Sequence, residues 1–327
     1  MKRREFLGTI GGLAAFPYAA LARQSANLRR IGALFSQAEN DPEGQLRVNA
    51  FRAGLRDLGW FEGQNLHIEY RWAGGGINRQ RLLAAELVKE NLEVIFASAT
   101  TALVALRDAT TTVPIVFAQV TDPVGAGFVK SLSRPGGNIT GLTQHEFSIG
   151  VKWLELLKQL APQITRVAVL HDQNPAWTGY LRAIESAAIP MGVAVMPMLI
   201  RDRSEIVRGI EAFAAQPNGG FILLPGPIGS NNRDLVISLA ARHRLPAVYA
   251  FRYHVISGGL VSYGIDNVDL FRRAAFYVDR ILKGDRPSDL PVQHPTKFQL
   301  VINSKTAKAL GIDPPISLLA RIDEVIE

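Results

Sequence analysis

Short apolar runs alternate with amphipathic stretches from Arg29 onward, and this alternation constrains the fold more than any other feature of the chain. Arg30 to Phe35 has the pattern of a first strand. Leu46 to Leu58 has apolar residues at helical spacing and is followed by Gly59, a residue that often ends a helix. Because neighbouring parallel strands need crossover connections, a repeated strand–helix order predicts parallel sheets covered by helices. The predicted fold class is therefore α/β.

The strand–helix pattern restarts after Thr143, which predicts two lobes, and 327 residues are enough to give each lobe its own core. The elements after the second unit are too few for a third domain, so the chain is expected to return to the first lobe and cross once more. We expect an N-terminal lobe of residues 28–143 plus 258–293 and a C-terminal lobe of residues 144–257 plus 294–327. The predicted architecture is two Rossmann-like lobes with parallel sheets, joined by a multi-strand hinge.

Residues 1–27 have the composition of an export signal, followed by the start of the mature chain. A basic start precedes the apolar, glycine-rich stretch Phe6 to Tyr18, and Ala20-Leu21-Ala22 presents small residues at the two positions that a signal peptidase recognises. Arg3-Arg4-Glu5-Phe6-Leu7 resembles a twin-arginine signal, and an ordinary Sec signal is the alternative. We expect cleavage after Ala22 and a periplasmic location.

Composition argues against several classes of function. The chain has no cysteine, so disulfides, cysteine-based metal sites and a lipid-modified cysteine are excluded, and we expect no membrane anchor of its own. Its six histidines show no metal-ligand spacing, so no metal and no cofactor are expected. The net charge of +7 is scattered rather than gathered in basic runs, which argues against nucleic acid as a partner. No Gly-x-Ser-x-Gly elbow and no phosphate loop is present, so the chain is not expected to be an enzyme.

Several strings, in this order and spacing, resemble those of ABC transporter substrate-binding proteins related to the tryptophan/tyrosine uptake receptor. They are Phe51 to Trp60, Ser98-Ala99-Thr100-Thr101-Ala102, Thr121-Asp122-Pro123-Val124, Arg134 to Gly141, Pro246 to Tyr249 and Gly258 to Gly264. The resemblance implies a type I periplasmic-binding-protein fold, whose two lobes close over a small molecule. It also implies an ABC permease and its ATPase as partners, and we expect a monomer.

The ligand implied by the resemblance is an amino acid or an aromatic or carboxylate compound. Many relatives carry an acidic or otherwise polar position in the loop before Arg233, whereas this chain has Pro225 to Asn232 there. The choice among these ligands therefore stays open.

Ligands of open α/β sheets bind beyond the carboxyl ends of the strands, where loops lead into helices. Ser98, Thr100 and Thr101 follow a predicted strand and could bind a carboxylate, although one of their hydroxyls could instead cap the next helix. Asp122 could receive a cationic or hydroxyl group, or could belong to an Asp-Pro turn.

Further candidates follow the other strands of both lobes. Tyr249 is preferred over Phe251 as the aromatic contact. The remaining candidates are Phe35, Asn174, Tyr263 and Asp266.

Two other classes of function remain open. One is a ligand-sensing accessory protein that signals through a partner. The other is an exported two-lobe hydrolase or isomerase that uses Asp122 and a hydroxyl group in the cleft.

Overall fold

The apolar runs of the first half of the chain form a parallel sheet. The computed structural model describes residues 28–74, 76–173 and 177–327, so the predicted export signal lies outside the described residues. Within them, one sheet has five strands in the order β2-β1-β3-β4-β5, all parallel. The elements of this lobe are β1 (Arg29–Phe35), α2 (Pro42–Asp57), β2 (Leu66–Trp72), α3 (Ile77–Leu87), β3 (Val94–Ser98), α4 (Thr100–Ala109), β4 (Ile115–Val120), β5 (Ile139–Thr143) and α11 (Asn267–Leu282).

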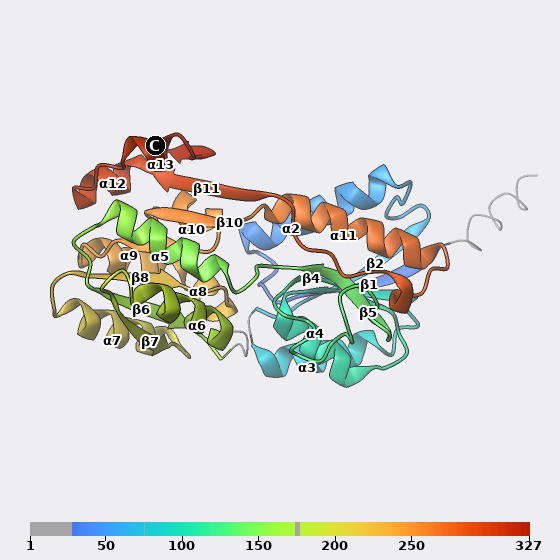
Figure 1. Cartoon of the computed structure of the whole chain (residues 1–327). Coiled ribbons are helices and arrows are strands. Elements are labelled where there is room, and N and C mark those ends of the chain that lie inside the picture. The colour runs from blue at the N-terminus through green and yellow to red at the C-terminus, as the bar shows by residue number, and fades with distance from the viewer. Residues whose placement is uncertain (1–27, 75, 174–176) are drawn as a thin grey trace, which may run out of the picture.

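The other described sheet has seven strands in the order β12-β11-β10-β9-β8-β6-β7, and only its β10–β11 pair is antiparallel. It forms the second lobe, on the left in Figure 1. Its elements are α5 (Ile149–Leu160), β6 (Arg166–His171), α6 (Trp177–Ala188), β7 (Ala194–Leu199), α7 (Arg203–Ala214), β8 (Gly219–Leu223), α8 (Pro227–Asn231), α9 (Arg233–Arg242), β9 (Ala247–Tyr249), α10 (Arg252–Ile256), β10 (Val261–Ile265), β11 (Phe298–Asn303), α12 (Ser304–Leu310), α13 (Ile316–Leu319) and β12 (Glu324–Ile326). The α/β class and the two-lobe architecture are confirmed.

The segment expected to return to the first lobe is divided between the two lobes. β10 pairs with β9 and β11 in the second sheet, so residues 258–265 do not belong to the first lobe as predicted. The following helix and the segment up to Gln293 do return. The hydroxyl of Thr140 in β5 donates to the carbonyl of Leu290 (2.6 Å), and Figure 1 shows α11 beside α2. A Cβ atom at Gly54 of α2 would lie 2.4 Å from the carbonyl oxygen of Arg272 in α11, so this glycine permits the close contact. A strand pattern predicts a strand but does not say which of two sheets it joins, which explains the error.

The chain passes between the lobes in three of its described segments: after β5, between β10 and α11, and before β11. These segments are bonded to one another. The backbone N–H of Thr143 donates to the carbonyl of Gln293 (2.9 Å), and that of Ile265 donates to Nε2 of His145 (3.3 Å). The hinge is therefore a group of connected segments rather than one flexible linker.

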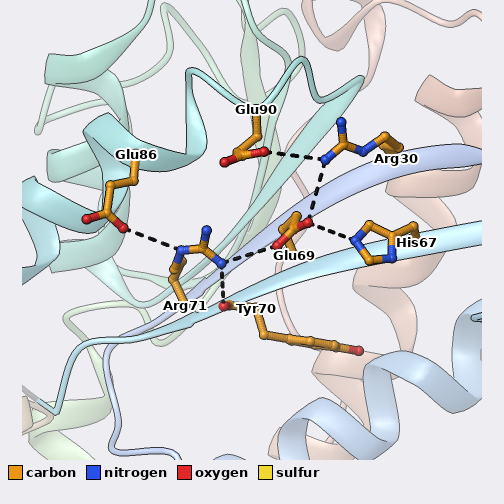
Figure 2. Close-up of polar contacts among 7 residues, drawn as sticks. All are labelled: Arg30, His67, Glu69, Tyr70, Arg71, Glu86 and Glu90. Carbon is orange, nitrogen blue, oxygen red and sulfur yellow. Dashed lines mark hydrogen bonds and ion pairs between the residues drawn. The ribbon is translucent and has the colours of Figure 1, made fainter.

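The edge strand β2 carries a network of charges (Figure 2). Oε1 of Glu69 lies 2.8 Å from Nε2 of His67 and 3.5 Å from the guanidinium of Arg30, and Arg71 contacts the other carboxylate oxygen at 3.3 Å. The hydrogen bond from His67 is the main cause that lowers the pKa of Glu69. Charged side chains on an edge strand hinder pairing with another sheet. Protection of this edge accounts for the network.

Candidate functional site

A pocket lies between the two lobes, beyond the carboxyl ends of β1, β3 and β4. On the first lobe and hinge side it is lined by Ser36, Gln37, Arg47, Ala99, Thr100, Thr101, Gln119 and Gln144. On the second-lobe side it is lined by Pro225, Gly226, Pro227, Ser230, Phe251 and Tyr253. The first wall is polar and the second is rich in proline and aromatic rings, so the pocket suits a molecule with one polar and one flat apolar part.

The start of α4 forms one part of the polar wall. Ala99 has a positive φ of 80°, and its N–H donates to the carbonyl of Ala118 (2.9 Å), which fixes the turn from β3 into the helix. The hydroxyl of Thr101 lies 3.2 Å from that of Ser36, and Ser36 donates to the carbonyl of Ser98 (2.8 Å). The first N–H groups of a helix have no partner within it, and they favour a negative ligand group.

Arg47 brings a positive charge into the same wall. Its side chain belongs to α2 and is 3% exposed. The guanidinium carbon lies 5.8 Å from the ring centre of Tyr253 and 5.7 Å from that of Phe271. Within the described part of the chain no carboxylate pairs with it, and its Nε has no hydrogen-bond partner. Glu43, one turn earlier on α2, is close enough for its charge to act on Arg47 but forms no ion pair with it. A buried guanidinium without a directly bonded counter-charge is unfavourable, so Arg47 can receive an anion.

Two glutamines add polar groups to this wall. Oε1 of Gln37 is buried without a hydrogen-bond partner among the described residues. Gln119 has a positive φ of 61° at an irregularity in the pairing of β4 with β5, and its amide donates to Asn267. Backbone strain in residues other than glycine is concentrated at binding sites in many proteins. Ala99 and Gln119 both line this pocket, so its walls combine strain with unused polar atoms.

The second-lobe wall is fixed by stacking and by a chain of hydroxyl groups. The rings of Phe251 and Tyr253 stack with centres 5.3 Å apart. The hydroxyls of Tyr253 and Ser230 lie 2.7 Å apart, and Ser230 donates to the carbonyl of Gly226 (2.8 Å). This side offers ring faces and proline surfaces rather than charge.

Of the residues predicted from the sequence, Thr100 and Thr101 line the pocket. Phe35 instead lies in the core, 0% exposed, and stacks on Trp72 with ring centres 4.4 Å apart. Ser98 is also buried below the pocket and contributes only its carbonyl, to Ser36. Successive strand residues point to opposite faces. At β1 the residue after the strand, Ser36, lines the pocket instead of the last strand residue, Phe35, whereas Gln119 lines it from within β4.

The preference for Tyr249 over Phe251 does not match the structure. Tyr249 is 1% exposed and stacks on His254 (4.9 Å) in the second-lobe core, whereas Phe251 lines the pocket. β9 ends at Tyr249, so the chain has left the sheet before Phe251. The residue beyond the strand is again the one that faces the other lobe.

Three other candidates lie outside the interlobe pocket. Asp122 is exposed and accepts a hydrogen bond from the N–H of Gly125 (2.9 Å), which matches the turn interpretation. Asp266 caps α11 by accepting from the N–H of Asp269 (3.1 Å). Tyr263 lines a surface depression at the hinge and stacks on Phe298 (5.9 Å). Asn174 lies outside the described residues.

Sequence reasoning missed Arg47, and a signal for it was present. Gly44, Val48 and Phe51 are buried on the same helix at spacings that place Arg47 on the buried face. A charged residue on such a face requires a counter-charge or a function. Ser36 also had a signal, because it is the polar residue directly after a predicted strand. The other missed polar and aromatic pocket residues carry no comparable signal: Gln37, Gln119, Gln144, Ser230 and Tyr253.

Two α/β lobes joined by bonded crossing segments, with a pocket between them, define a two-lobe binding protein of the type I periplasmic fold. The chain belongs to the family described as ABC transporter substrate binding protein, whose profile matches residues 36–326.

Named relatives agree with this assignment. The chain is 28% identical over 289 residues to the Tyrosine-binding protein of Clostridioides difficile (strain R20291), covering 88% of this chain and 82% of the relative. It is similar to the crystal structure of an ABC domain in complex with L-Trp from Streptococcus pneumonia, with a TM-score of 0.84, 26% identity, and coverage of 91% of this chain and 99% of that one. It is also similar to the ligand-free, open structure of a substrate-binding protein with adhesive properties from Clostridium difficile, with a TM-score of 0.67 at the same identity and coverage.

Within the described residues, no helix is both long and apolar enough to cross a membrane.

Proposed function

We propose that this chain is the substrate-binding protein of an ABC uptake transporter, and that it captures a small carboxylate-bearing molecule between its lobes without transforming it. The observation that carries the proposal is Arg47, a buried guanidinium without a carboxylate partner among the described residues, in the wall of the interlobe pocket. The ligand carboxylate would bind Arg47 and the first N–H groups of α4, because both favour negative charge. A permease and its ATPase would then receive the ligand.

The relatives support an amino acid or an aromatic acid as the ligand class. One relative is named a tyrosine-binding protein and another was solved in complex with L-Trp. A ring would lie against Phe251 and the prolines of the second-lobe wall, Pro225 and Pro227. Apolar walls with a few fixed polar groups are typical of small-molecule sites.

Hinge closure would couple binding to transport. The chain is more similar to the L-Trp complex than to the ligand-free, open structure, although identity and coverage are equal in the two comparisons. This difference supports a closed arrangement of the lobes here. A ligand that contacts both walls stabilises the closed state, because only contacts that differ between two states shift their equilibrium.

The place of action would be the periplasm. The basic start, the paired Arg3 and Arg4 and the small residues up to Ala22 support export by the twin-arginine route. A monomer that shuttles freely to its permease is the simplest form of such a receptor.

Binding measurements on Arg47→Met test the proposal. Native mass spectrometry of the freshly purified protein would identify a retained ligand, and calorimetry with L-tyrosine, L-tryptophan and aromatic acids would measure affinity. We expect binding with one ligand per chain, and a loss of at least about tenfold, or about 1.4 kcal/mol, in Arg47→Met. The matched control is Arg56→Met, on an exposed position of the same helix. Equal affinity in Arg47→Met and wild type, or chemical turnover of the bound molecule, would contradict the proposal.

A further inference from the structure

We propose that Tyr253 is a positioning residue that holds the guanidinium of Arg47 in its ligand-binding place only when the lobes are closed. The inference rests on the proposed function, because Arg47 is the residue proposed there to bind the ligand. It adds that the contact between Tyr253 and Arg47 stabilises the closed state and so links carboxylate capture to lobe closure.

Tyr253 and Arg47 meet across the cleft. Tyr253 belongs to α10 of the second lobe and is 5% exposed, whereas Arg47 belongs to α2 of the first lobe. The guanidinium of Arg47 lies over the Tyr253 ring at 5.8 Å. A cation over an aromatic face is attracted by the ring, and more strongly when both are shielded from water. This contact can exist only while the lobes are together.

The same ring faces a second guanidinium. Arg233 of the second lobe lies 5.9 Å from the ring centre of Tyr253, and its charge is balanced by Asp41 of the first lobe at 3.0 Å. Arg47 has no such carboxylate partner within the described segments. The ring is therefore the main second-lobe group that stabilises Arg47 before a ligand arrives.

The Tyr253 ring is held in a fixed orientation. Its hydroxyl lies 2.7 Å from that of Ser230, and its ring is inclined by 16° to that of Phe251 (centres 5.3 Å apart) and by 29° to that of His254 (4.4 Å). Because Ser230 and Phe251 also line the pocket, the ring moves together with the second-lobe wall. Opening of the cleft would remove the Tyr253 contact and leave Arg47 with groups of its own lobe, the Phe271 ring at 5.7 Å and the nearby carboxyl of Glu43.

An interlobe distance measurement tests the proposal without knowledge of the natural ligand. The sequence contains no cysteine, so Leu82→Cys on α3 and Ile189→Cys after α6, both highly exposed, give one fluorophore site on each lobe. Single-molecule energy transfer then measures the closed fraction in the absence and presence of L-tryptophan as a probe. We expect a closed population in the ligand-free wild type, and Tyr253→Leu should lower the closed-to-open ratio about tenfold.

Two further variants separate positioning from simple packing. Tyr253→Phe keeps the ring and should retain the wild-type closed-to-open ratio to within about threefold. In the double variant Arg47→Met with Tyr253→Leu, the closed-to-open ratio should be no lower than in either single variant. Each single substitution already removes the contact between the two residues, so the second adds nothing. Melting curves establish that each variant is folded. If Tyr253→Leu does not fold, the closed-to-open ratios of the two single variants Tyr253→Phe and Arg47→Met test the proposal instead.

Several outcomes would overturn the inference. The first is a ligand-free wild type without a closed population, and the second is an equal closed fraction in wild type and Tyr253→Leu. The inference is also overturned if Tyr253→Phe is as open as Tyr253→Leu, or if the effects of the two single substitutions add in the double variant. Failure of the proposed function has a different signature. In that case, no small carboxylate would bind or shift the wild-type distribution, while the ligand-free difference between wild type and Tyr253→Leu would remain.

Discussion

Thr101 and Asp122 occupy similar positions in the sequence pattern, since each follows a strand, but only Thr101 lines the pocket. Thr101→Val removes one hydroxyl contact and should weaken ligand binding about three- to tenfold, the value of one ordinary hydrogen bond. Asp122→Asn keeps the turn, because asparagine also tolerates its positive φ of 44°, and should leave affinity unchanged. Calorimetry with the ligand identified by mass spectrometry measures both. A loss of affinity in Asp122→Asn would return that residue to the site.

At the scale of elements, two helix starts meet across the cleft. Asp41 precedes α2, where one carboxylate oxygen caps Gly44 (2.9 Å) and the other pairs with Arg233 at the start of α9 (3.0 Å). A positive side chain is unfavourable at a helix start, so Arg233 gains from the acidic residue of the other lobe. Asp41→Asn keeps a capping oxygen but removes the charge, and it should lower ligand affinity about fivefold by destabilising the closed state.

The control for Asp41→Asn is a second aspartate on the same helix. Asp57 pairs with Arg272 of α11 inside the first lobe, and both side chains are more than half exposed. Asp57→Asn should therefore leave ligand affinity unchanged in the same titration. Small-angle scattering of Asp41→Asn should show a larger mean radius than wild type, and identical scattering would mean that the ion pair does not affect closure.

At the scale of the whole molecule, buried histidines couple stability to pH. Burial lowers the pKa of His145, in the hinge, and of His254, in the second lobe, to about 3. Their unfolded pKa is near 6.5, so the unfolded chain binds protons that the folded chain rejects. The stability they contribute is fully present above pH 6.5 and declines as the pH falls from 6.5 toward 3. Each of these two histidines should lower the free energy of unfolding by up to about 1.4 kcal/mol for every unit by which the pH falls in this range.

Urea unfolding at pH 7.5, 6.0 and 5.0 measures this decline. His145→Gln should show a smaller pH dependence than wild type, whatever its stability at pH 7.5. Burial raises the pKa of Glu43, so its titration also contributes to the pH dependence, but it does so in wild type and variant alike. Parallel pH profiles in wild type and His145→Gln would mean that folding does not shift the pKa of His145, and would contradict this prediction.

Much of the fold could be predicted because its signals are local. The alternation of apolar and amphipathic segments gave the α/β class and two lobes, and the strand ends located the edge of the sheet where the pocket lies. Thr100 and Thr101 were found because a polar residue after a buried strand can be recognised from its immediate neighbours. Phe35 and Tyr249 were misplaced because the last residue of a strand faces the core or the cleft according to a register that the sequence does not give.

The sequence by itself therefore determined the strand and helix order, the number of lobes and the sheet edge where the interlobe pocket lies, since these follow from periodicity over a few residues. Only the tertiary structure decided that β10 joins the second sheet, that α11 packs on α2, and that Arg47 meets Tyr253 between the lobes. The physical reason is that such pairings depend on shape and charge brought together from distant parts of the chain. No local pattern records them, and the binding site consists largely of such pairings.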